Sequence, residues 1–141
     1  MNQKLIAVLL ALAMTATWAG CSKDDAKRAV RDIEKKAREF VNAERDTTMT
    51  RIDEVTQAVN AFYLKLHRYP SGLHELVEPP SDKAEAAVWV KLLDEIPTDA
   101  WGTELQYELD FNDAGIVVHV FSCGPDKKPG TDDDLPPRKS K

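Results

Sequence analysis

The spacing of apolar residues predicts one long helix over residues 24–66. In residues 26–41, apolar side chains recur every three or four positions, and acidic and basic residues fill the positions between them. The same stripe resumes over residues 49–66 with larger apolar side chains, which we expect to dock on the core. The polar residues 44–48 fit either an exposed stretch of one continuous helix, which we favour, or a break with a threonine as a new N-cap.

Shorter elements follow this helix. Proline and glycine positions and the apolar spacing predict short helices at 71–77 and 84–93, a turn-rich connector at 96–102, strands at 103–109 and 116–122, and a hairpin turn at 112–115. A helix followed by a hairpin is an α+β arrangement, in which the long helix buries its apolar stripe against a small antiparallel sheet. The first half of the helix would then be a charged stalk or a partner helix for another subunit.

The amino-terminal pattern is typical of a secreted protein. A single lysine, Lys4, precedes the apolar run 5–14, small residues follow, and Cys21 stands at the exit. The run is shorter than the roughly 20 apolar residues that span a bilayer. Cys21 resembles the lipidated cysteine of a bacterial lipobox, although Trp18 stands where leucine is usual. The alternative is an ordinary signal peptide that is cut near Ala19.

Ser22 rather than aspartate follows the cysteine, so the lipoprotein sorting pattern indicates the outer membrane, facing the periplasm, if the source is Gram-negative. Removing the signal deletes one lysine and no acid, which changes the formal net charge from −5 to −6. That acidic balance argues against a nucleic-acid partner. If Cys21 is acylated, the other cysteine, Cys123, has no intramolecular partner and is best tolerated when buried; otherwise the two could form a disulfide.

An acidic loop near the carboxyl end carries the candidate chemistry. Four aspartates, Asp126, Asp132, Asp133 and Asp134, stand among glycines and prolines in residues 124–135. Calcium prefers six to eight oxygen ligands of this kind, so a closed loop could direct both sides at one cation. The spacing is not that of an EF-hand. A solvated acidic loop is the alternative.

The order of several short motifs resembles the periplasmic domain of the major pseudopilin of type II secretion systems, protein G. The matching segments lie between about Thr50 and Leu135 and are 61–70, 72–77, 96–102 with Tyr107, 121–126 and 132–135. The resemblance implies a pilin-like fold in which a long helix packs on a small antiparallel sheet. It also implies that the last acidic loop binds calcium.

The resemblance assigns a ligand set by position. Asp126, Asp133 and Asp134 match the family's carboxylate ligands, Asp132 is an alternate, and backbone carbonyls near Cys123 and Thr131 would complete the shell. The chain departs from the family at its start, where pseudopilins have a short basic leader and a long apolar helix with a glutamate. We therefore expect a pseudopilin-type head on a lipoprotein anchor that does not polymerise in the usual way.

These observations predict four segments: a lipoprotein signal peptide at 1–20, a charged helical stalk at 21–48, a pseudopilin G-like domain at 49–135 and a basic tail at 136–141. The motifs of common catalytic sites are absent from the sequence, so we do not expect an enzyme. We expect a calcium-stabilised structural or interaction module, held at the membrane through lipidated Cys21, that serves secretion or pilus-like machinery. The alternative is a small envelope hydrolase or a ligand-binding lipoprotein.

Overall fold

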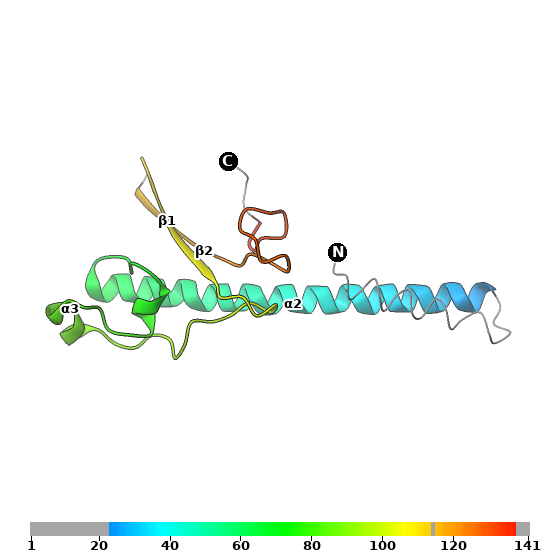
Figure 1. Ribbon diagram of the computed structural model, residues 1–141, viewed down its shortest axis with the longest axis horizontal. Coiled ribbons are helices and arrows are strands. Elements are labelled where there is room, and N and C mark those ends of the chain that lie inside the picture. Colours follow the sequence, from blue (N-terminus) through cyan, green and yellow to red (C-terminus); the bar gives the residue numbers. More distant parts are fainter. Residues whose placement is uncertain (1–22, 114, 138–141) are drawn as a thin grey trace. The chain divides into compact units, whose positions relative to one another are not determined.

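The computed structural model describes residues 23–113 and 115–137 and has an α+β fold (Figure 1). The helix α2 spans Lys23–Leu66 without a break, as the apolar spacing predicts. A 3₁₀ helix, η1, spans Leu73–Leu76, and the short helix α3 spans Lys83–Val88. The strands β1, Gln106–Asn112, and β2, Gly115–Phe121, pair antiparallel. A long helix and a small antiparallel sheet are the architecture that the sequence predicts.

The chain divides into two compact units between Ala43 and Glu44. The described part of the first unit is the amino-terminal portion of α2, where Val30 and Phe40 are 51% and 60% exposed. No helix among the described residues is both apolar enough and long enough for a membrane span. The predicted signal peptide, Cys21 and most of the basic tail lie outside the described residues.

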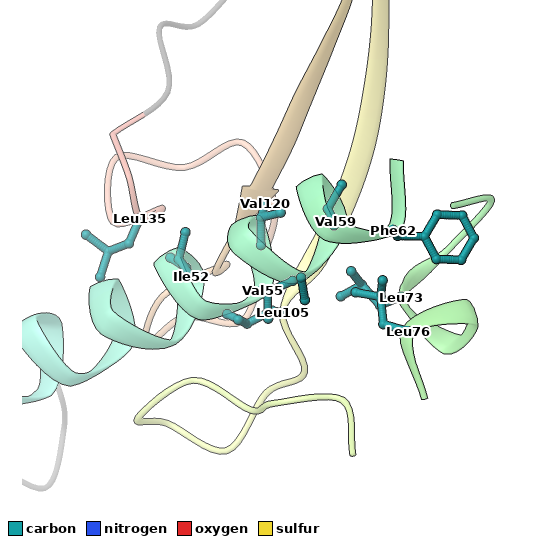
Figure 2. Close-up of a cluster of buried hydrophobic side chains, with 10 residues drawn as sticks. Ile52, Val55, Val59, Phe62, Leu73, Leu76, Leu105, Val120 and Leu135 are labelled. Carbon is teal, nitrogen blue, oxygen red and sulfur yellow. The ribbon is translucent and has the colours of Figure 1, made fainter. Parts of the chain in front are cut away.

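The second unit is built on the carboxy-terminal part of α2. Buried side chains at Ile52, Val55, Val59 and Phe62 lie one or two turns apart, so they form one face of the helix (Figure 2). The rest of the buried cluster is contributed by the later elements, namely Leu73, Leu76, Leu105, Val120 and Leu135, together with Ala58 of α2. Figure 2 shows Leu135 toward the Ile52 end of this row and Leu76 toward the Phe62 end. The acidic loop is therefore joined to the core through Leu135.

The polar stretch 44–48 was expected to be exposed, and that expectation is wrong at Thr48, which is fully buried. Its hydroxyl donates to the carbonyl of Glu44 at 2.9 Å and accepts from the backbone N–H of Ala100 at 3.1 Å. The helix is continuous through this stretch, and its polar side chain at Thr48 binds the connector instead of solvent.

Several element boundaries differ from those predicted. The segment 71–77 forms only the 3₁₀ turn η1, between Gly72 and the prolines at 79 and 80. The helix predicted over 84–93 ends at Val88, because Trp89 is extended and its indole N–H donates to the carbonyl of Glu75 at 2.7 Å. The backbone N–H groups of Leu92 and Leu93 donate to the carbonyl of Leu76 instead of continuing α3.

The first strand also begins later than the predicted Thr103. Residues 103–105 are held by the connector, since the N–H of Leu105 donates to the carbonyl of Pro97 and Thr98 pairs with Glu104. The hairpin turn is confirmed, because Asn112 and Gly115 are paired across it and Gly115 has a φ of +124°.

An ion cluster joins the end of α2 to η1 and α3. Arg68 donates to Glu75 at 2.8 Å and to Glu85 at 2.6 Å, and its guanidinium lies 5.2 Å from the ring centre of Phe62. Burial raises the pKa of Glu75, but hydrogen bonds from Arg68 and from the backbone N–H of Ser71 outweigh it and leave this pKa below its usual value. The hydrogen bond from Arg68 lowers the pKa of Glu85 as well.

Candidate metal centre

The acidic loop is closed at its base by a pair of backbone hydrogen bonds. The N–H of Ser122 donates to the carbonyl of Leu135 at 2.8 Å, and the N–H of Leu135 donates back to Ser122 at 3.0 Å. Both residues are buried, with exposed fractions of 0% and 1%. Residues 122 and 135 therefore form an anchored neck, and the carboxylates of the loop project from a fixed base.

Inside this neck, the two sides of the loop touch at Gly124. Gly124 is buried and has a φ of +65°, which favours glycine. A Cβ added to it would lie 2.4 Å from the carbonyl oxygen of Asp133. Only glycine allows the chain after β2 to approach the chain before Leu135 this closely.

Two predicted ligands, Asp126 and Asp133, lie together across the loop. The backbone N–H of Asp126 donates to Asp133 Oδ2 at 3.2 Å, and the hydroxyl of Thr131 donates to Asp133 Oδ1 at 2.6 Å. The hydrogen bond from Thr131 lowers the pKa of Asp133, and the N–H of Asp126 acts in the same direction. Asp126 Oδ1 in turn accepts from the backbone N–H of Lys128 at 2.8 Å. The structure thus places Asp133 next to both Thr131 and the backbone of Asp126.

Asp134 is the most unusual residue of the loop. It is 1% exposed, and its Oδ2 accepts from the backbone N–H of Gly130 at 2.8 Å. Its Oδ1 is buried and has no hydrogen-bond partner among the described residues. A buried carboxylate oxygen without a donor is costly, so a water molecule or a cation is expected to satisfy this atom in place of the described residues.

The other predicted ligands are Asp132 and the backbone carbonyls near Cys123 and Thr131. Asp132 is exposed, whereas Cys123 is buried with an exposed fraction of 4%. The carbonyl of Thr131 accepts from the N–H of Asp134 at 3.3 Å, which is a long hydrogen bond. Among the described residues, no three His, Cys, Asp or Glu side chains lie close enough together to hold a metal ion. Cys21 lies outside those residues, so its lipidation and its alternative disulfide with Cys123 stay predictions.

The donor set nevertheless fits a hard cation. The oxygen atoms come from carboxylates and backbone carbonyls, which are the ligands that calcium prefers. Oδ1 of Asp134, which has no partner among the described residues, supplies a specific reason for a cation. Asp126 and Asp133 come from opposite sides of the loop and meet where the N–H of Asp126 donates to Asp133 Oδ2. With calcium bound, Asp126, Asp133 and Asp134 would hold it by their carboxylates, and the carbonyls of Cys123 and Thr131 would add neutral oxygens.

Sequence reasoning missed a buried hydrogen-bond chain that reaches the loop from the connector. Asp99, 2% exposed, accepts at Oδ1 from the backbone N–H groups of Trp101 and Thr103. Its Oδ2 accepts from the hydroxyl of Ser122 at 2.6 Å, and Ser122 Oγ accepts from the N–H of Gly124 at 2.9 Å. The only local sequence signal is the turn-forming pattern around Asp99. The pairing with Ser122, 23 residues away, has no sequence signature.

Comparisons with known proteins agree on one family. The family described as "Type II secretion system (T2SS), protein G" matches residues 22–136. The type II secretion system core protein G of Pectobacterium carotovorum is 34% identical over 98 residues, which are 66% of this chain and 62% of that protein. The protein of the same name from Dickeya chrysanthemi is 29% identical over 136 residues, 93% of this chain and 75% of that protein.

A solved structure of the same secretion system is also similar to this chain. The crystal structure of the major pseudopilin from the type 2 secretion system of enterohaemorrhagic Escherichia coli is similar, with a TM-score of 0.56 and 27% sequence identity. The match covers 69% of this chain and 88% of that one. The chain spans less than two thirds of the Pectobacterium protein, although it spans most of this solved domain.

Proposed function

The chain belongs to the family of type II secretion system protein G, and on that premise we propose that it is a non-enzymatic, structural component of secretion machinery in the cell envelope. The observation that carries this proposal is the match over residues 22–136, which includes the acidic loop as well as the helix. The relatives that are named as core proteins of the secretion system support the same role. A hydrolase or ligand-binding role, the alternative from the sequence, has no comparable support.

The loop of residues 122–135 is proposed to bind calcium. Its neck is anchored in the core, its donors are oxygens, and Asp134 Oδ1 is buried without a partner in the part of the chain that the structure describes. Repulsion between neighbouring carboxylates opposes their convergence when no cation is present. Calcium would offset that repulsion, and the loop would tighten around it. The internal hydrogen bonds of Asp126 and Asp133 would then give way in part to ion contacts.

Membrane attachment is proposed to run through a lipid on Cys21. The apolar run, the small-residue exit and a cysteine at this position support it. Acyl chains contribute about 0.8 kcal/mol per buried CH₂, so several chains on one cysteine anchor a protein stably. Mass spectrometry of the mature protein from membranes tests this: a diacylglyceryl-modified Cys21 at the amino terminus is expected, and an unmodified terminus near residue 20 would contradict it.

A genetic experiment tests the secretion role. Deleting the gene in its native host should reduce the proteins exported to the medium, and the wild-type chain should restore them. Asp134→Asn is expected to restore export poorly, whereas Asp53→Asn, an exposed change of the same charge on α2, should restore it fully. Unchanged export after deletion would contradict a role in secretion.

A further inference from the structure

We infer that Asp99 and Ser122 are positioning residues for the cation loop, and that they couple the order of this loop to the connector at residues 96–102 and to Thr103, which follows it. The inference rests on the proposed calcium site, but it concerns residues that supply no proposed ligand atom. Both side chains are buried, and a carboxylate in such a place is retained only when its hydrogen bonds are satisfied. Here Oδ1 of Asp99 accepts from backbone N–H groups of its own turn, and Oδ2 accepts from Ser122 at the base of the loop.

The first link fixes the position of Asp99. Two backbone N–H groups of its own turn, those of Trp101 and Thr103, donate to Oδ1 at 3.0 Å and 2.8 Å. Its carbonyl also accepts from Arg51 of α2 at 3.2 Å. Since the Oδ1 atom and the backbone carbonyl of Asp99 each have their own hydrogen bonds, the side chain is fixed with Oδ2 directed toward Ser122.

The second link fixes the neck of the loop. Ser122 donates its hydroxyl proton to Asp99 Oδ2, so its lone pairs are free to accept the N–H of Gly124. Gly124 lies so close to Asp133 that a Cβ on it would collide with the Asp133 carbonyl. A chain of single contacts therefore runs from the connector to the backbone of a proposed ligand.

This arrangement has the same logic as the outer shell of a metal site, in which hydrogen-bond partners of the ligands set their orientation. Loss of such a partner costs about 10–100-fold in metal affinity. Removing the Ser122 hydroxyl leaves the Gly124 N–H without an acceptor and Asp99 Oδ2 without a donor. Asn at position 99 places an amide N–H against the Ser122 hydroxyl and reverses the direction of that hydrogen bond.

Calcium titration calorimetry on the detergent-solubilised full chain tests the affinity. Ser122→Ala and Asp99→Asn are each expected to raise the calcium Kd about 10-fold or more. The matched control is Glu75→Gln, which perturbs a buried carboxylate in the Arg68 cluster that shares no hydrogen bond with this chain of contacts. The calcium Kd of the Glu75→Gln variant should stay within about twofold of the wild-type value. Two variants are measured, so that if one of them fails to fold the other still tests the inference.

Hydrogen exchange separates positioning from general destabilisation. In wild type, added calcium should slow exchange both in residues 122–135 and in the connector, at the amides of Trp101 and Thr103. In Ser122→Ala, saturating calcium should still slow the loop but not the connector. A connector that responds equally in both proteins, or a Kd unchanged in both variants, would overturn the inference while leaving the calcium site in place. No calcium response of the wild-type loop would overturn the calcium site and the inference together.

Discussion

Replacing Asp134 with asparagine should have opposite effects on the stability of the protein with and without calcium. Without calcium, the wild-type protein buries a carboxylate oxygen, Oδ1 of Asp134, that has no donor within residues 23–113 and 115–137. Leaving a buried group unsatisfied costs about 1–3 kcal/mol, and more when it is charged. A neutral amide keeps an acceptor for the N–H of Gly130. Its buried NH2 group also lacks a partner, but an unpaired neutral group costs less than an unpaired charge. We therefore expect calcium-free Asp134→Asn to be more stable than wild type by about 1 kcal/mol.

With calcium, the order should reverse. A ligand at 100 times its Kd stabilises the native state by about 2.7 kcal/mol. If loss of the carboxylate weakens binding about 100-fold, the same concentration stabilises Asp134→Asn by only about 0.4 kcal/mol. For a unit of this size, 1 kcal/mol corresponds to roughly 4–8 °C in Tm. Wild type should thus gain roughly 10–20 °C on calcium addition, and the variant only a few degrees.

Differential scanning calorimetry in EDTA and in excess calcium measures both effects. Asp53→Asn is the control for general screening of an acidic protein by a divalent ion, because Asp53 is exposed and the variant changes the charge by the same amount as Asp134→Asn. Magnesium in place of calcium is the control for ion specificity. The reasoning is refuted if calcium leaves the wild-type Tm unchanged, or if Asp134→Asn is less stable than wild type in EDTA.

Three further predictions follow from contacts elsewhere in the second unit. Gly124→Ala should destabilise the protein by about 2 kcal/mol or more in chemical denaturation, because a steric clash adds to the backbone strain. The control Gly130→Ala, at a φ of +86° with open space around it, should cost only about 1 kcal/mol. Equal losses would contradict the close approach of Gly124 to Asp133. The lowered pKa of Glu75 means that the folded state binds fewer protons than the unfolded state, so this carboxyl stabilises above pH 4.5 and the contribution is lost as the pH falls through the folded value. Arg68→Gln should reduce that acid-side slope in pH-dependent melting, because Arg68 lowers the pKa of both Glu75 and Glu85, and an undiminished slope would refute the assignment. Thr103→Val should stabilise the protein by about 1 kcal/mol in urea titration, because the Thr103 hydroxyl is buried and has no partner among the residues described; a loss of stability would show that the hydroxyl is used.

The long helix and the hairpin could be predicted because their signals are local. The apolar stripe that ends at Leu66 has the helical period, and the glycine at 115 meets the demands of a hairpin turn. The boundaries that were wrong depend on distant partners. Trp89 leaves the helical conformation because its indole reaches the carbonyl of Glu75, and no periodicity encodes that contact.

The candidate site was partly predictable for the same reason. The number of aspartates and the glycines in the loop are visible in the sequence, and they indicate a hard cation. The unequal environments of these aspartates are not visible. Asp134 is buried next to Leu135, whose side chain packs in the core. Asp132, further from Leu135 in the sequence, is exposed. The connection of Ser122 to Asp99 likewise exists only after the chain has folded.

The most direct measurement is a crystal structure of the protein grown with excess calcium. The account predicts a calcium ion in the 122–135 loop, with carboxylate oxygens of Asp126, Asp133 and Asp134 at about 2.3–2.6 Å, including Oδ1 of Asp134. A loop without an ion, in which Oδ1 of Asp134 faces only protein atoms or water, would contradict it.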